Sequence, residues 1–454
     1  MSCNMQISKS DYMLSRKHPA WLWVEKNDPS KIPPIDDATQ ATFDAGHAFE
    51  PYVESQFAGG VTLGFADADE YASLPRRTQQ ALDAGAEVLF QSRFEWKEFT
   101  CMPDIVKVIG DRAVHLYEIK SNTRVKPEHL EDLAFQKVVL EGNGYDVQQV
   151  SVVHVNNQYV RHGEIDPKEL AVFADVTNEV SDIARSTPGY MQAALSGATQ
   201  LTMPDPNPNL ARFGSKPEWM RVYNNIFPPE PKVWPEGIAP EINKAEIKRF
   251  LDELQYPLYF FDYETMQGVV PYFDGQRPYR QVPFQYSLHI IREPGGGVEH
   301  TEYLHGDTSN PAPMLVEQLV KDMGDSGSII AWNMRFEKSV NEELGRMYPE
   351  FAERIAAINQ RVVDLMIPFK SKWYDDPRFE GSASIKKVLP VMCPELSYQD
   401  LGIHDGNSAQ RLWMEAVLTG ARPDEKEQIL ADLTEYCKMD TWAMVRIWQE
   451  LTKL

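Results

Sequence analysis

The chain has 454 residues, of which 43% are hydrophobic and 25% charged, and its 45 Lys and Arg against 67 Asp and Glu give a formal net charge of −22. This composition excludes a wholly disordered chain, a fibre and a membrane channel, and the length predicts two domains. The acidic balance argues against polyanion binding by the whole surface, because clustered Lys and Arg bind phosphate backbones. Local nucleic-acid binding stays open.

The sequence gives no sign of a membrane or secretory protein. No run approaches the roughly 18 apolar residues that a membrane-spanning helix needs. The first residues, MSCNMQISKSDYMLSRKHP, contain no apolar signal core, which favours a cytoplasmic location. The cysteines lie far apart without a CxxC pair, so we expect buried or neutral thiols and neither a disulfide scaffold nor a zinc ribbon: Cys3, Cys101, Cys393 and Cys437.

The first half of the chain predicts a small α/β layer structure. Runs rich in β-branched and aromatic residues predict successive strands over 87–96, 100–110 and 112–121. Apolar residues then recur at helical spacing over 127–144, between a proline and two glycines, and another strand is predicted over 147–160. Three strands, a helix and a strand in this order favour an α/β domain.

A first acidic constellation is predicted on these strands. Glu118 and Lys120 lie two apart on the third strand and share a face, and the second strand brings Asp104 beside them. Such a group suits a metal-dependent phosphodiesterase, in which Asp104 and Glu118 hold a divalent ion and Lys120 orients water or offsets phosphate charge. The alternative is a solvated strand face.

The element order around Met102-Pro103-Asp104 and Glu118-Ile119-Lys120 resembles the PD-(D/E)xK nuclease family, in its RecB-like branch. The resemblance implies a further metal ligand on an upstream helix, where FDAGHAFEPYVES offers Glu50, and a supporting glutamine after Lys120, for which we take Gln136. The branch often has His where Glu50 stands, and Tyr where this chain has Leu140. Glu50 and Gln136 are equally compatible with the surface of amphipathic helices.

Prolines recur between residues 201 and 245, where neither helical nor strand periodicity persists. This segment predicts a connector between a first domain over 1–200 and a second over 246–454. Its Trp and Phe residues indicate that it packs along the domains, because a freely swinging linker would be rich in Gly and Ser.

The second half predicts another α/β domain. Residues 258–265 form a short aromatic strand, and 283–291 and 298–305 form a hairpin across a PGGG turn. A further strand over 328–333 leads into a helix, and a long helix is predicted over 424–451 from apolar residues at intervals of three and four.

A second acidic constellation lies in this domain. Asp262 and Glu264 share one face of an otherwise apolar strand, and burying two carboxylates there is costly unless a cation pairs with them. Glu337 stands at the predicted junction of a strand and a helix. Tyr436 and Asp440 lie one turn apart on the last helix.

The DxE strand, the acidic residue after an N-x-x-F element and the YxxxD helix resemble the DEDD exonuclease superfamily of the RNase H-like fold, in its tyrosine-containing subgroup. The resemblance implies that two divalent ions, Mg²⁺ or Mn²⁺, are held by four carboxylates: Asp262, Glu264, Glu337 and Asp440. It also implies that Tyr436 positions the attacking water. Glu337 stands where the superfamily usually has Asp. Two ions can stabilise both the attacking and the leaving oxygen of a phosphodiester.

Most of the chain resembles prokaryotic proteins in which a RecB-like nuclease is fused to domain of unknown function 2779, with RNase H-like motifs. The resemblance is carried by ISKSDYMLSRKHPAWLWV, FFDYETM, PFQYSLHI, SIKKVLPVMCPELSYQDL and EYCKMDTWAMVRI. Several relatives have cysteines suited to an iron–sulfur cluster, whereas this chain has His18 at the first such position and no cysteine in the connector, so we expect no cluster. The expected fold is α/β: an N-terminal restriction-endonuclease-like domain and a C-terminal RNase H-like domain.

These patterns predict a metal-dependent nuclease with two active sites, a DNA exonuclease acting on ends or single strands in repair or defence. Nucleic acid is the expected partner, DNA before RNA. Two alternatives stay open. In one, only the C-terminal domain cleaves, DNA or RNA, and the N-terminal domain binds nucleic acid. In the other, the protein is a non-enzymatic scaffold with structural carboxylates.

Overall fold

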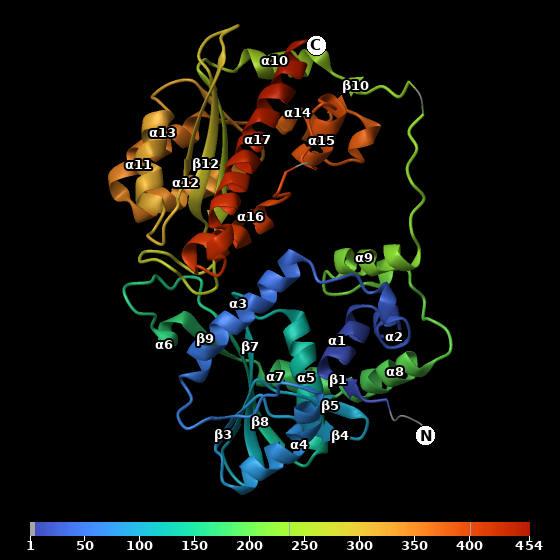
Figure 1. Cartoon of the computed structure of the whole chain (residues 1–454). Coiled ribbons are helices and arrows are strands. Elements are labelled where there is room, and N and C mark those ends of the chain that lie inside the picture. Colours follow the sequence, from blue (N-terminus) through green and yellow to red (C-terminus); the bar gives the residue numbers. More distant parts are fainter. Residues whose placement is uncertain (1–4, 236, 400) are drawn as a thin grey trace. The chain divides into compact units, whose positions relative to one another are not determined.

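The computed structural model describes residues 5–235, 237–399 and 401–454, so that Cys3 lies outside the described residues. The chain forms two compact mixed α/β units, Met1–Pro231 (unit 1) and Lys232–Leu454 (unit 2), shown in Figure 1. The division falls inside the predicted connector over 201–245. Among the described residues, no helix has both the length and the apolar character needed to cross a membrane.

Unit 1 is built on a six-stranded mixed sheet in the order β2-β3-β6-β7-β8-β9. These strands are β2 (Val61–Thr62), β3 (Val88–Phe90), β6 (Ile105–Val108), β7 (Ala113–Lys120), β8 (Asp146–Val155) and β9 (Ala171–Asp175). The central strand β7 pairs antiparallel with β6 and parallel with β8. A three-stranded sheet, β1-β5-β4, is formed by β1 (Ile7–Ser8), β5 (Phe99–Cys101) and β4 (Phe94–Trp96).

Nine α-helices are described in unit 1: α1 (Lys9–Lys17), α2 (Pro19–Asn27), α3 (Asp37–Glu54), α4 (Ala68–Asp83), α5 (Pro127–Gly142), α6 (Pro167–Leu170), α7 (Thr177–Ala184), α8 (Thr187–Thr199) and α9 (Lys216–Ile226). The predicted helix over 127–144 is confirmed as α5. It is buried on most sides, because it contacts β8 as well as α1, α7 and α8. Its residues Leu133 and Val139 share a core with Leu116 and Val150 of the sheet.

Two of the predicted strands are each divided in the structure. The first contains β3 and β4, and the second contains β5 and β6, separated by Met102-Pro103-Asp104. Pro103 has no amide hydrogen and a fixed φ, so it interrupts strand pairing. The prediction that Asp104 lies within a strand is therefore wrong, since it directly precedes β6. Its position is still next to β7, because Ile105 pairs with Tyr117.

The predicted connector contains regular structure that the sequence pattern concealed. Helix α9 buries Trp219 and Val222 against α2, and the Trp219 ring stacks on that of His18 with centroids 4.0 Å apart. The expectation that helical periodicity is absent from the connector is therefore wrong over α9. The pattern was hidden because the helix is short and prolines flank its apolar residues. Unit 2 begins within the predicted connector at Lys232, and this part of the connector includes β10 (Glu241–Ile242).

Unit 2 has a five-stranded sheet in the order β13-β12-β11-β14-β15. Its strands are β11 (Leu258–Met266), β12 (Val282–Ile291), β13 (Val298–Leu304), β14 (Ser328–Ala331) and β15 (Val362–Asp364), and β10 pairs separately with β16 (Tyr374–Asp375). The predicted strand and hairpin over 258–305 are thereby confirmed. Strands β11 to β13 run antiparallel, whereas β14 is parallel to β11 and β15.

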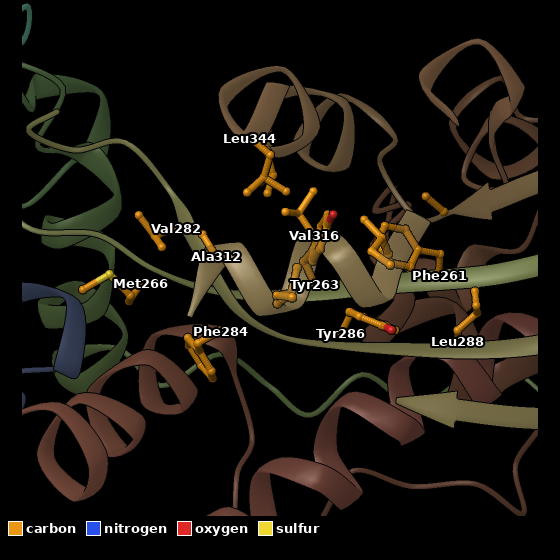
Figure 2. Close-up of a cluster of buried hydrophobic side chains, with 14 of the residues drawn as sticks. Phe261, Tyr263, Met266, Val282, Phe284, Tyr286, Leu288, Ala312, Val316 and Leu344 are labelled. Atoms are coloured by element: carbon orange, nitrogen blue, oxygen red, sulfur yellow. The ribbon is translucent and has the colours of Figure 1, made fainter. Parts of the chain in front are cut away.

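The described helices of unit 2 are α10 (Lys244–Asp252), α11 (Ala312–Asp322), α12 (Arg335–Met347), α13 (Ala352–Arg361), α14 (Ile367–Lys370), α15 (Ile385–Met392), α16 (Gly406–Trp413) and α17 (Lys426–Thr452). The long C-terminal helix predicted over 424–451 is α17, which packs along β11 and β12. Phe261 and Tyr263 point into a core with Val316 of α11 and Leu344 of α12 (Figure 2). Since side chains alternate along a strand, Asp262 and Glu264 face the opposite side of the sheet.

Candidate functional sites

The site in unit 2 forms where β11 passes beneath α17. Asp262 and Glu264 of the strand line a pocket of about 400 Å³ together with Tyr436 and Asp440 of the helix. Leu258 and Phe260, four and two residues before Asp262, contact the apolar part of α17, so the strand face that holds the carboxylates is fixed by core packing. The structure thus brings together four of the residues predicted from the sequence.

Burial and mutual repulsion make these carboxyl groups hard to ionise. Burial, together with the charge of Asp440, raises the pKa of Asp262 and of Glu264 well above the ordinary range. Burial also raises the pKa of Asp440 to about 6, against the opposing effect of a hydrogen bond from the Tyr398 hydroxyl to Oδ1, 2.6 Å long. The sequence pattern did not reveal Tyr398, which lies 42 residues from its partner.

Glu337 lies in the first turn of α12 and is 2% exposed. Its Oε2 atom has no hydrogen-bond partner among the described residues. Burial raises its pKa to about 8, and the charge of Asp364 adds to this effect. Asp364 Oδ1 accepts hydrogen bonds from the backbone amides of Asn333 and Met366, each 3.0 Å long, so this carboxylate holds the junction between β14 and α12.

One ammonium faces the unit 2 carboxylates. Lys386 of α15 lines the same pocket, donates a hydrogen bond to the His404 carbonyl, and lies 5.6 Å from the ring centroids of both Tyr398 and Tyr436. Its charge opposes the rise in the pKa of Asp262, Glu264 and Asp440. Among the described residues of the pocket, this one ammonium does not neutralise the carboxylates of Asp262, Glu264 and Asp440, and such a set of oxygen ligands would fit Mg²⁺ or Mn²⁺.

Cys437 lies beside this oxygen-rich site. One ligand atom each from Asp262, Glu264 and Cys437 lie within 4.8 Å of one another. Burial, followed by the charge of Asp262, raises the pKa of the Cys437 thiol well above its ordinary value, in line with the neutral thiol expected from the sequence. A protonated thiol is a poor ligand, and hard cations prefer oxygen, so the carboxylates are the groups that could hold such an ion.

The site in unit 1 is centred on Glu118, which is 1% exposed. Its Oε1 atom accepts hydrogen bonds from the ammonium groups of Lys9 and Lys120, each 2.7 Å long, and its Oε2 atom accepts one from Gln136 Nε2, also 2.7 Å long. Glu118 and Lys120 come from β7, Gln136 from α5 and Lys9 from α1. Gln136 is therefore a buried member of the cluster and not a surface residue.

Asp132 completes this cluster from α5. Its carboxylate accepts hydrogen bonds from Lys120 Nζ at 2.9 Å and from Gln136 Nε2 at 2.8 Å, and Lys9 Nζ lies 3.7 Å from its Oδ1 atom. Sequence reasoning missed both Lys9 and Asp132. Asp132 lies four residues before Gln136 on one helix face, which is a usable signal. Lys9 lies 109 residues from Glu118 in the sequence, so no local pattern signals their contact.

The two predicted carboxylates of unit 1 respond differently to burial. Burial and the charge of Glu118 raise the pKa of Asp104 to about 7, although its Oδ2 atom accepts a 2.6 Å hydrogen bond from the Ile119 amide. Burial alone would raise the pKa of Glu118 as well, but the ammonium groups of Lys120 and Lys9 outweigh it and hold this pKa well below the usual range.

Glu50 lies near the end of α3, outside this network. No hydrogen bond or ion pair described for this chain joins it to Asp104 or Glu118. Its charge instead adds to the burial that raises the pKa of Glu54, one turn away on the same helix. Among the described residues, Glu50 thus has no hydrogen bond or ion pair to the unit 1 cluster, and its place as a metal ligand stays a prediction.

One known family model is similar to part of unit 2. Residues 259–384 match the family "Domain of unknown function (DUF2779)". This segment contains Asp262, Glu264 and Glu337 and ends before Tyr436 and Asp440. The match is consistent with the fusion expected from the sequence.

The relatives found among curated proteins are distant. The "Uncharacterized protein MG366 homolog" of Mycoplasma pneumoniae is 26% identical over 259 residues, which are 53% of this chain and 37% of that protein. The "Uncharacterized protein MG366" of Mycoplasma genitalium is 24% identical over 219 residues, 44% of this chain and 33% of that protein. The chain thus spans about a third of the length of these relatives. No solved structure gave a significant match.

Proposed function

We propose that unit 2 hydrolyses phosphodiester bonds of nucleic acid and uses Mg²⁺ or Mn²⁺ as its cofactor. The observation that carries the proposal is the convergence of Asp262, Glu264 and Asp440 on one pocket. The charge of Glu337 also acts on Asp262, and the Glu337 Oε2 atom has no hydrogen-bond partner among the described residues. Buried carboxylates without paired cations are strongly unfavourable, and a divalent ion offsets this cost. Asp262 and Glu264 on the central strand, with Tyr436 and Asp440 on the last helix, support an RNase H-like fold of DEDD type.

Four side chains would hold the metal: Asp262, Glu264, Glu337 and Asp440. When bound, the ion supplies positive charge to the phosphodiester oxygens on which negative charge develops during hydrolysis. Burial and the charge of Asp440 raise the pKa of Tyr436 far above its usual value, so this residue keeps its proton. We therefore assign Tyr436 to orienting the attacking water by a hydrogen bond, and Tyr398 to holding Asp440 in place.

The substrate we propose is the end of a nucleic-acid strand, DNA before RNA. A pocket of about 400 Å³ has small-molecule dimensions and suits one terminal nucleotide better than a long duplex. Its wall offers aromatic surface from Trp332 and Phe336 and amide groups from Gln281 and Asn407. Such groups bind bases by stacking and hydrogen bonding, and Lys386 supplies charge for a phosphate.

Unit 1 is proposed as a second nuclease site with a restriction-endonuclease-like fold. The favouring observation is that Asp104, Glu118, Lys120 and Gln136 gather at one end of β7. Here Asp104 and Glu118 would hold the metal, and Lys120 would face the phosphate. The alternative, in which unit 1 binds nucleic acid without cutting it, rests on Glu50 having no hydrogen bond or ion pair to this group among the residues described.

The experiment uses end-labelled single- and double-stranded DNA and RNA in Mg²⁺, Mn²⁺ or chelator. The wild type is compared with Asp104→Asn, Asp262→Asn, the double variant and, as a matched control, Asp325→Asn, which alters an exposed carboxylate of unit 2. We expect Asp262→Asn to remove one metal-dependent product ladder and Asp325→Asn to leave cleavage unchanged. If Asp104→Asn removes a second product ladder, this would support the proposed nuclease site of unit 1. If the wild type neither cuts nor binds ions, the scaffold alternative replaces both proposals.

A further inference from the structure

Lys9 is held at the unit 1 cluster by its own local structure. Strand β1 ends at Ser8, which pairs with Thr100 of β5, and α1 begins at the next residue. The Ser8 side chain accepts a hydrogen bond from the Asp11 amide, while the Asp11 carboxylate accepts one from the Ser8 amide, so the start of the helix is closed on both sides. The backbone of Lys9 is therefore fixed beside β5, the strand that precedes Asp104.

The ammonium of Lys9 occupies the carboxylate oxygens that a metal would need. Lys9 Nζ lies 2.7 Å from Glu118 Oε1 and 3.7 Å from Asp132 Oδ1. Lys120 binds the same Oε1 atom, and Gln136 binds Oε2. Both oxygens of Glu118 are thus engaged by donors from this chain. Two ammonium groups face the three carboxylates of Asp104, Glu118 and Asp132, so the cluster supplies most of its own positive charge.

We propose that Lys9 is a built-in counter-ion that competes with a divalent cation for Glu118, so that unit 1 binds metal only as the Lys9 ammonium withdraws. This inference rests on the second site under the proposed function. A divalent ion bound by Asp104 and Glu118 would lie within a few ångströms of Lys9 Nζ, where like charges repel strongly. The Lys9 side chain is 20% exposed, which gives it an outlet to solvent.

Calorimetric titration with MnCl₂ tests this competition in the full chain. Asp262→Asn and Asp440→Asn are introduced first to remove metal binding by unit 2. In this parent, Lys9→Met and Lys9→Gln remove the charge, Lys9→Arg retains it, and Lys17→Met removes a lysine from the same helix that pairs with the distant Glu218. We expect Lys9→Met and Lys9→Gln to raise the affinity for Mn²⁺ at least about tenfold, and the other two to leave it unchanged.

Asp104→Asn provides the internal control. Added to Lys9→Met or Lys9→Gln, it should abolish the gain in affinity, because the gained site includes Asp104. The proposal is overturned if neither neutral variant binds Mn²⁺ more tightly than the parent, or if the gain survives Asp104→Asn. Circular dichroism identifies a variant that fails to fold, and Lys9→Gln, which can still donate to Glu118, then decides the outcome. If the affinity for Mn²⁺ rises but no cleavage depends on Asp104, the Lys9 inference holds and the proposed nuclease activity of unit 1 does not.

Discussion

The two acidic clusters of this protein use similar residues in opposite electrostatic settings. In unit 1, Glu118 receives two ammonium groups and an amide, and its pKa lies well below the usual range. In unit 2, burial and the charge of Asp440 raise the pKa of Glu264 well above that range. Exposure does not explain the difference, because the two glutamates are 1% and 6% exposed. The partners decide it, so unit 1 is largely neutralised from within, whereas the proposed function supplies an external cation to unit 2.

The largest expected effect on stability comes from breaking the neutralised cluster. Glu118→Gln leaves the ammonium groups of Lys9 and Lys120 without their shared carboxylate, and losing one partner of a buried ion pair costs about 3–5 kcal/mol. We expect a loss of this size in the unfolding free energy of unit 1, measured by hydrogen exchange of β7 and α5 peptides in urea. Glu141→Gln, which replaces an exposed carboxylate paired with Lys137 of α5, should cost under about 1 kcal/mol, because Lys137 keeps its hydrogen bond to the Val147 carbonyl.

A loss for Glu118→Gln no greater than for Glu141→Gln would show that the cluster is solvated and that its ion pairs contribute little. The comparison between the two units would then rest on unit 2 alone.

The corresponding substitution in unit 2 should raise the unfolding free energy instead of lowering it. Glu264→Gln removes one of several mutually repelling carboxylates, so in chelator we expect it to stabilise unit 2 by about 1–2 kcal/mol. Hydrogen exchange of β11 and α17 peptides in urea measures this. Mn²⁺ at 100 times its dissociation constant should stabilise the wild type by about 2.7 kcal/mol and the variant by less.

Glu299→Gln serves as the control for this prediction. Glu299 lies in β13 of the same sheet but is exposed and paired with Arg292, so its loss should not stabilise the unit. Destabilisation by Glu264→Gln in chelator would mean that the unit 2 carboxylates are held by interactions other than a metal ion.

The contrast between the units was only partly predictable from the sequence. Glu118 with Lys120, and Tyr436 with Asp440, follow the strand and helix periods, so their shared faces were accessible to local reasoning. Lys9 and Tyr398 reach their carboxylates only through tertiary packing, across 109 and 42 residues. These missed donors matter most in unit 1, where Lys9 changes the charge of the whole cluster.

Backbone interruptions set the other limit. Pro103 splits a run that looks like one strand and moves Asp104 into the link before β6, while α9 hides its apolar face among the prolines of the supposed connector. In both cases a single Pro or a short helix outweighed the average pattern of the window. The long elements, β11, β12 and α17, were predicted well because their periodicity extends over many residues.

A pH dependence should also distinguish the metal-bearing from the metal-free form of unit 2. Asp440 and Glu337 have folded pKa values of about 6 and 8, both above their unfolded values near 4. Their contribution to stability is therefore fully present below about pH 4 and is lost as the pH rises through 6 and 8. In chelator, we expect the urea concentration at the unfolding midpoint of unit 2 to decrease as the pH rises from 5 to 8. Asp440→Asn should flatten this slope, and saturating Mn²⁺ should reverse it because the ion favours ionised carboxylates. A midpoint in chelator that stays level or rises over this range would mean that the carboxylates are ionised without a metal, which removes the contrast with unit 1.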